Sequence, residues 1–185
     1  MRKETKDIHV IRTLRLKKDP DDIMVRDAKE NGLSINTFYN KNIEKYVNSF
    51  RLIDKFPCLA IPCEIVKEFL NEIPEEKAVH LGKIFGAYIP KESLFLKDKN
   101  LTAKNMISLM KTAGQDNNWF QFNEQNQNGN TKIMLRHQYG MNWSIFLKNF
   151  YQTIFQQIFK TKIKIETGEN VLILFLPKTE IITIY

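Results

Sequence analysis

Seven cationic side chains crowd the first eighteen residues of the chain, with only two carboxylates among them. The cationic residues are Arg2, Lys3, Lys6, Arg12, Arg15, Lys17 and Lys18. This tenth of the chain therefore has a net charge of +5, out of +7 for the whole protein. A basic segment of this kind attracts phosphate groups, as the surfaces of nucleic-acid-binding proteins do. The same charges would also suit a solvated tail that has no partner.

A second cluster of side chains able to do chemistry lies in the sequence LRHQYGMNWS, residues 135–144. It holds His137, Tyr139, Asn142 and Trp143 at the junction of a predicted strand and a predicted helix, a common position for a ligand pocket. Asn142 also suits the cap of that helix, and Trp143 also suits the core. These four residues are the candidate pocket of the C-terminal part of the chain.

Motifs for metal binding and for catalysis are missing from the sequence. Cys58 and Cys63, taken with His80 or His137, match no common zinc-binding spacing. The sequence also lacks a glycine-rich phosphate loop, a nucleophile elbow and a His-Glu-x-x-His motif. We therefore predict no metal, no cofactor and no enzymatic activity. An enzyme would have to use His137 and its neighbours.

The basic segment itself has the pattern of an extended strand. From His9 to Leu16, the side chains of Thr13 and Arg15 would lie on one face and those of Leu14 and Leu16 on the other. One face is therefore apolar, and the opposite face carries a polar and a cationic side chain.

Two helices are predicted after this strand. Asp19 is expected to cap the first helix, with Pro20 at its first position, and Gly32 ends it as a glycine with positive φ. Ser34 is expected to cap a second helix over residues 35–49, in which apolar side chains recur at helical spacing.

A unit of one strand and two helices needs a partner for its strand. About fifty residues bury too little surface to fold alone, and the strand has two unpaired edges. A second copy of the chain would supply the missing strand across a two-fold axis. The resulting two-stranded antiparallel ribbon has a size that enters the major groove of B-DNA.

The run TLRLKK, the helix ending at Gly32 and the segment LSINTFYNKNIEKYV resemble ribbon-helix-helix DNA-binding proteins of the Arc, MetJ and CopG type, over about residues 8–50. Arg12 and Asp27 depart from the family pattern at positions that are usually apolar. The resemblance implies a base-contacting face made of Thr13 and Arg15, with Arg12 and Ile11 at its margin. It also implies a shared dimer core made of Leu14, Leu16, Phe38 and Ile43.

Phosphate contacts are expected on both sides of this core. The N-terminus of the second helix offers the backbone N–H groups of Ser34, Ile35 and Asn36 and the positive end of the helix dipole. Lys17 and Lys18 would bind further phosphates and set the register on the duplex, while Arg15 contacts a guanine.

The remainder of the chain, residues 51–185, has the pattern of an α+β domain. Helices are predicted over 63–73, 75–88 and 101–113, with a loose segment at 89–100. A strand near 119–122, a hairpin turn at Asn128-Gly129, and a strand at 131–136 follow. A long helix with an apolar stripe from Trp143 to Ile158 comes next. Two strands follow, at 162–166 and 171–176, with Gly168 as the turn between them, and residues 181–184 could add a further strand. This order predicts helices packed on an antiparallel sheet.

Composition limits the classes of protein further. Of the 185 residues 43% are hydrophobic, which is enough for a core, and two cysteines exclude a disulfide scaffold. The N-terminus lacks the apolar region of a signal peptide and no run is long enough to span a bilayer, so we expect a cytoplasmic, nucleoid-associated protein without membrane contact.

Together these patterns predict a homodimeric, sequence-specific transcriptional regulator of prokaryotic type that binds double-stranded DNA. Residues 1–50 would dimerise and bind DNA, and residues 51–185 would sense a small ligand, contact another protein or extend the oligomer. The alternative is an antitoxin-like interaction module, which dimerises through the ribbon and neutralises a partner protein.

Overall fold

The chain divides into two compact units in the computed structural model, which describes residues 10–51, 60–97, 99–127 and 130–177. The first unit is Met1–Lys45 and the second is Tyr46–Tyr185. The division therefore comes five residues before the boundary expected from the sequence. The hydroxyl of Ser49, which donates to Asp116 Oδ2 at 2.7 Å, ties the segment after Lys45 to the second unit.

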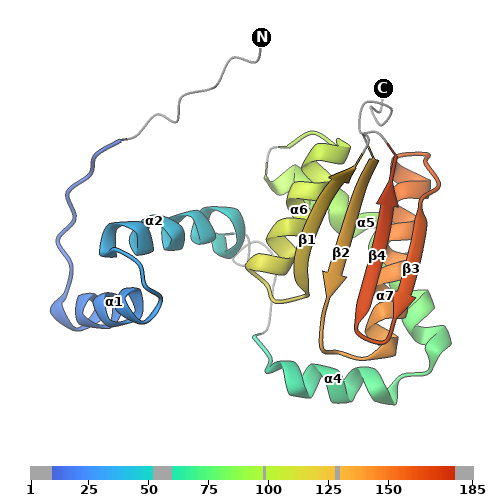
Figure 1. The fold of residues 1–185 in the computed structure, drawn as a ribbon, viewed down its shortest axis with the longest axis horizontal. Coiled ribbons are helices and arrows are strands. Elements are labelled where there is room, and N and C mark those ends of the chain that lie inside the picture. The colour runs from blue at the N-terminus through green and yellow to red at the C-terminus, as the bar shows by residue number, and fades with distance from the viewer. Residues whose placement is uncertain (1–9, 52–59, 98, 128–129, 178–185) are drawn as a thin grey trace, which may run out of the picture. The chain divides into compact units, whose positions relative to one another are not determined.

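The described part of the first unit contains two helices (Figure 1), α1 from Lys18 to Glu30 and α2 from Ile35 to Lys45. Gly32 ends α1 with a φ of 65°, a conformation that glycine adopts without steric cost. Its N–H donates to the carbonyl of Lys29 at 3.0 Å, and the N–H of Leu33 donates to the carbonyl of Ala28 at 2.9 Å. This pair of bonds is the Schellman motif, and it sets the direction in which α2 leaves α1.

The predicted cap of the second helix is confirmed. Ser34 Oγ accepts a hydrogen bond from the N–H of Thr37 at 3.1 Å. The predicted cap of the first helix is wrong, because α1 begins earlier, after Lys17, and no side chain caps it. Pro20 lies within the first turn, where N–H groups have no partner in the helix in any case, so proline there costs little.

Residues 10–17 have no regular secondary structure in the single chain, so the strand predicted there is not present. A strand is defined by its pairing, and no described segment pairs with this one. The described part of the first unit buries one hydrophobic residue, Ala28. Its exposed large apolar side chains are Val10, Ile11, Leu14, Leu16, Ile23, Val25 and Ile43.

The second unit is built on a four-stranded antiparallel sheet in the order β1-β2-β4-β3, as Figure 1 shows. The strands are β1 Gln121–Gln127, β2 Asn130–Arg136, β3 Lys164–Gly168 and β4 Val171–Leu176. Buried and half-buried residues alternate along β2 and β4, so one face of the sheet packs on the core. The predicted order of two strands, a helix and two strands is confirmed, although Gly168 ends β3 and does not form the turn.

Two of the predicted features of this sheet lie partly or wholly outside the described residues. The strands on either side of Asn128 and Gly129 pair as a hairpin, with Gln127 opposite Asn130, but those two residues themselves are not described. The further strand expected at 181–184 also lies outside the described residues.

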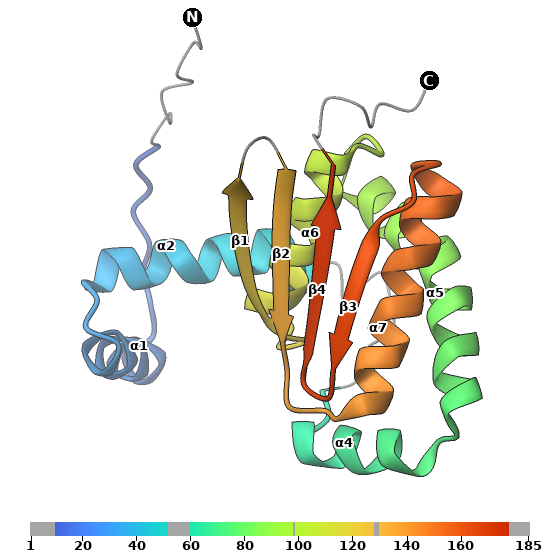
Figure 2. The ribbon, with the colours of Figure 1, turned by 45° about the vertical axis from the view of Figure 1, so that its right-hand side comes forward.

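The helices of the second unit cover one face of the sheet and one of its ends (Figures 1 and 2). They are α4 Cys63–Glu72, α5 Glu75–Leu96, α6 Ala103–Gln115 and α7 Met141–Thr153. Two π-helical turns extend helices, η1 over Tyr46–Phe50 and η2 over Ile154–Ile158. The core lies between α5, α6 and α7 and the sheet, and it includes Leu135, Leu147, Phe155, Leu172 and Leu174. The α+β class is therefore confirmed.

Helix α5 is eight residues longer than the sequence predicts, because it continues through Pro90 to Leu96. Every fourth residue from Ala78 onward is buried, including Gly82, Gly86, Pro90 and Leu94. A Cβ atom at Gly82 or Gly86 would lie 2.5 Å from a backbone carbonyl oxygen of α7. The two helices thus lie side by side in close contact (Figure 2), and this packing outweighs the tendency of proline to end a helix.

Candidate functional site

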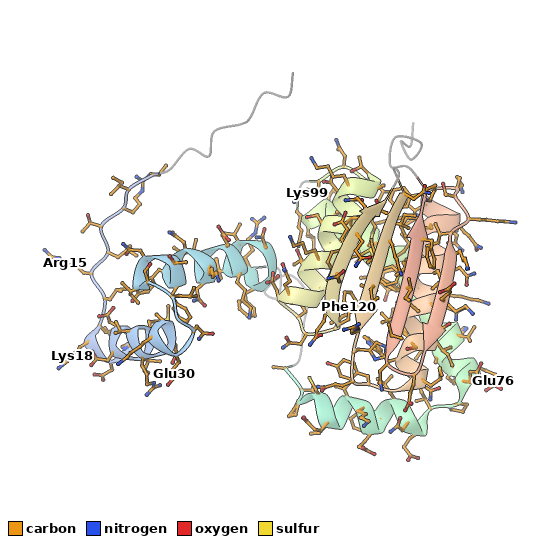
Figure 3. The ribbon with its side chains drawn as sticks, in the orientation of Figure 1. Arg15, Lys18, Glu30, Glu76, Lys99 and Phe120 are labelled. Atoms are coloured by element: carbon orange, nitrogen blue, oxygen red, sulfur yellow. The ribbon has the colours of Figure 1, made fainter. Side chains whose placement is uncertain are left out.

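The basic residues of the first unit are open to solvent. Arg15 and Lys18 extend outward from the segment before α1 and from its first turn (Figure 3), and Arg12 and Lys17 are exposed as well. Arg12 Nη1 donates to the backbone carbonyl of Ile11 at 3.2 Å. Among the described residues none of these four cations forms an ion pair. Their charge is therefore available to an external anion.

The predicted base-contacting residues all lie on the irregular segment ahead of α1. Thr13, Arg15, Arg12 and Ile11 are exposed in the single chain. Nothing in the fold of one chain forces Thr13 and Arg15 to a common face, because that face would arise only when the segment pairs as a strand. Their contact with bases stays a prediction.

The predicted dimer core is not buried by a single chain. Leu14 exposes 65% of its surface, Leu16 and Ile43 are also exposed, and Phe38 is half-buried. Apolar side chains of this size usually lie inside a protein or in an interface. The structure of one chain thus leaves Leu14, Leu16 and Ile43 largely open to solvent.

The N-terminus of α2 offers unused backbone donors. The N–H of Thr37 is taken by Ser34 Oγ, and the N–H of Phe38 donates to the carbonyl of Ser34. The N–H groups of Ser34, Ile35 and Asn36 make no hydrogen bond with another described residue. The first turn of α2 also lacks acidic side chains, so its positive dipole end is not neutralised.

The predicted C-terminal pocket is divided by the structure. An open hollow of about 670 Å³ lies at the end of the sheet where β1 begins and β2 ends, and His137 and Tyr139 line it. Asn142 and Trp143 do not line it. The other residues of this hollow come from separate segments, so no local sequence pattern reveals them; among them are Cys63, Asn118, Phe120 and Arg136. Figure 3 shows Phe120 at the beginning of β1.

Burial keeps the ring of His137 neutral, and its hydrogen bonds determine which nitrogen carries the proton. Its Nδ1 accepts from the N–H of Tyr139 at 3.3 Å, and its Nε2 lies 2.9 Å from Ser144 Oγ. The Ser144 hydroxyl donates to the carbonyl of Glu169 at 3.2 Å, so the proton between His137 and Ser144 belongs to Nε2. Burial lowers the pKa of His137 to about 4, which keeps the ring neutral near pH 7.

This histidine–serine pair is arranged as a structural contact and not as a nucleophile with its base. A serine nucleophile needs an unprotonated histidine nitrogen facing its hydroxyl, whereas Nε2 of His137 carries its proton. Ser144 also has 0% of its surface exposed, so no substrate reaches its oxygen. The pair joins the end of β2 to α7 and to the turn between β3 and β4.

Tyr139 joins two loops to the beginning of α4. Its hydroxyl donates to the carbonyl of Asn118 at 2.9 Å and lies 3.1 Å from Cys63 Sγ. Burial, and next the hydrogen bond with Cys63, raise the pKa of Tyr139 well above its usual range. The hydroxyl therefore stays protonated and acts as a hydrogen-bond donor at all physiological pH values.

Asn142 and Trp143 support the fold by contacts that span long stretches of sequence. Asn142 Nδ2 donates to the carbonyls of Leu70 and Ile73, at 2.7 and 2.8 Å, and so satisfies the C-terminal end of α4. The alternative role of Asn142, as the cap of its own helix, is wrong, because Gly140 takes the N-cap position of α7. Trp143 Nε1 donates to the carbonyl of Trp119 at 3.2 Å, and its ring stacks on Phe146.

Within the described residues, no group of three or more histidine, cysteine or acidic side chains is placed to hold a metal ion. No helix in that part of the chain combines the length and apolar character needed to cross a membrane. Comparison with protein-family models, curated proteins and solved structures found no match to this chain.

Proposed function

We propose that this protein is a homodimeric DNA-binding transcriptional regulator. Residues 10–17 of two copies would pair as an antiparallel ribbon that enters the major groove of double-stranded DNA. The observation that carries the proposal is the first unit itself, in which an extended basic segment with exposed leucines precedes two helices joined by a Schellman turn.

Burial of the exposed apolar residues supplies the driving force for pairing. Full burial of a leucine or isoleucine side chain stabilises by about 1.5–3 kcal/mol. Leu14, Leu16 and Ile43 expose 65%, 50% and 54% of their surface in one chain. A dimer would therefore gain about half of this energy from each of six side chains, in addition to the ribbon hydrogen bonds. This gain is comparable with the roughly 4–15 kcal/mol that association costs in lost freedom of motion.

Pairing also explains how the cationic side chains would reach bases. Side chains alternate across a strand, so burial of Leu14 and Leu16 turns Thr13 and Arg15 to the opposite face. Arginine forms two hydrogen bonds with guanine in the major groove, and each such contact contributes about 1–3 kcal/mol of base discrimination. A two-fold dimer presents Arg15 twice.

Phosphate contacts would hold this ribbon in register. Lys17 and Lys18 come at the end of the basic segment, and the unused N–H groups at the N-terminus of α2 offer a further anion site. The Schellman turn at Gly32 fixes α2 relative to α1, so the donors are already oriented before DNA binds. The second unit would then act as the regulatory domain.

Assembly can be tested with a pair of opposite substitutions in the basic segment. Leu14→Glu should remove the ribbon contact and so lower the mass of the assembly in sedimentation experiments on the full chain, because the ribbon would bury a carboxylate. Thr13→Glu should leave the dimer intact, because it lies on the other face. Leu14 is exposed in one chain, so neither variant should unfold the protein. If the wild-type and Leu14→Glu proteins have the same mass in solution, the ribbon is ruled out.

DNA recognition requires a second measurement, fluorescence anisotropy on DNA from upstream of the protein's own coding sequence and on a scrambled duplex. Arg15→Ala should weaken binding to the specific DNA much more than to the scrambled DNA. Lys17→Ala should weaken both similarly and reduce the slope of log affinity against log salt by about one unit for each phosphate that is no longer bound. Equal losses for Arg15→Ala on both duplexes would make Arg15 a phosphate contact, and no binding at low salt would refute the proposal.

A further inference from the structure

Two helices of the second unit expose apolar side chains on faces turned away from its core. On α4 these are Ile65 and Phe69, with Ile61 just before the helix, and Phe69 exposes 66% of its surface. On α5 they are Ile84, Tyr88 and Phe95, and Phe95 exposes 79%. Both sets repeat at helical spacing, so each forms a continuous row along its helix.

The two faces differ in their charged side chains. Along α4, Glu64, Glu68 and Glu72 repeat every fourth residue and form an acidic row next to Ile65 and Phe69. Along α5, Lys77 and Lys91 fall on the same row as the apolar residues, and both are exposed. Glu76 and Glu92 lie to the sides of that row. The α4 face is thus apolar and acidic, and the centre of the α5 face is apolar and basic.

Contacts within the unit hold both helices in place. Hydrogen bonds to Asn142 and the contact of Cys63 with Tyr139 hold the two ends of α4. The close packing of Gly82 and Gly86 on α7 holds α5. A preformed surface loses little conformational freedom when it binds.

The two faces of one chain do not meet each other. Only Ile73 and Pro74 separate α4 from α5, and the half-buried or buried residues of each helix lie off its exposed apolar row. Figures 1 and 2 show α4 across one end of the sheet and α5 on the face of the sheet that the helices cover. The complementary surfaces can therefore pair only between two molecules.

We propose that the second unit associates with a second copy of itself, with the acidic and apolar face of α4 docked on the basic and apolar row of α5 from the other copy. In a two-fold arrangement each chain supplies one face of each kind, so the contact forms twice. This association is independent of the ribbon proposed for residues 10–17. A protein with both contacts would form assemblies larger than a dimer.

The test is sedimentation velocity on the full chain carrying Leu14→Glu, so that the ribbon makes no contribution. This protein should form dimers whose affinity falls as salt rises. Two double variants reverse the charges, Glu68→Lys with Glu72→Lys on α4, and Lys77→Glu with Lys91→Glu on α5. Each alone should weaken association at least about tenfold, because like charges then face each other.

An equimolar mixture of the two double variants decides the question. In a mixed dimer both contacts again pair opposite charges, so association should return to near the parental level. All four substituted residues are exposed, and Lys67→Ala on α4 serves as the control that should change nothing.

Failure of the mixture to restore association would overturn the proposal, as would a parent protein that stays monomeric into the high micromolar range. If the Leu14→Glu protein has the same mass in solution as the wild type, the proposed ribbon is refuted, and the charge-reversal test of the second unit still applies.

Discussion

The close approach of α5 to α7 makes a strong prediction for Gly86→Ala. A Cβ atom at Gly86 would lie 2.5 Å from the carbonyl oxygen of Phe150 and 3.1 Å from two more backbone atoms of the same residue. Ordinary contact begins near 3.4 Å, so the helices would have to separate by about 0.9 Å. Because all three atoms belong to the backbone, no side-chain rotation can relieve the clash.

Two opposing effects decide the magnitude. Alanine favours a helix over glycine by about 1 kcal/mol, which would stabilise the variant. Forcing an extra carbon into a packed core costs about 1–3 kcal/mol, and a clash with a whole helix belongs at the upper end of that range. We therefore expect Gly86→Ala to lower the free energy of unfolding by about 2 kcal/mol.

Urea unfolding monitored by tryptophan fluorescence measures this change in the second unit alone, because Trp119 and Trp143 both lie there. With a slope of about 2 kcal/mol per molar urea, the midpoint should fall by about 1 M. Lys83→Ala, an exposed change on the same helix, should shift the midpoint little. A Gly86→Ala protein that is more stable than the wild type would show that helix propensity dominates and that the two helices are not in such close contact.

Three further substitutions test the packing and the polar contacts of the second unit. Phe150→Ala should cost about 3–5 kcal/mol, because this buried ring packs among other aromatic rings, and a loss below about 1 kcal/mol in thermal melts would place it wrongly. Asn142→Ala should cost about 1–3 kcal/mol and speed amide exchange in the last turn of α4, whose carbonyls lose their donor. His137 has its pKa lowered to about 4 by burial, so the unfolded state binds more protons below about pH 6.5 and stability falls from there toward pH 4. His137→Gln should make the free energy of unfolding less dependent on pH in that range. If the pH dependence is unchanged, other groups cause the loss of stability.

Features set by neighbouring residues were predicted well from the sequence. Gly32 and Ser34 act through their own backbone and the next few residues, so the turn between α1 and α2 follows from local chemistry. The apolar stripe of α7 and the continuous apolar run of β4 are equally local, and they predict the correct order of elements.

Features set by distant residues were not predictable in this way. Helix α5 continues through Pro90 although proline disfavours it, and Gly82 and Gly86 of this helix pack closely on α7. The spacing of Ala78, Gly82 and Gly86 was the signal that could have revealed this packing. Asn142 satisfies carbonyls about seventy residues away, which no local pattern encodes. The pairing of residues 10–17 depends on another molecule, so it stays a prediction at the level of one chain.

The order of strands has a consequence for how the second unit folds. The sheet consists of two hairpins, β1 with β2 and β3 with β4, joined only by the pairing of β2 with β4, where Leu135 lies opposite Leu172. Isolated hairpins form within about 1–10 μs but are marginally stable in water. Neither hairpin should persist until α7 brings the second one back to the first. We therefore expect this docking step to limit the refolding rate, and a single cooperative phase in stopped-flow fluorescence is the observable result.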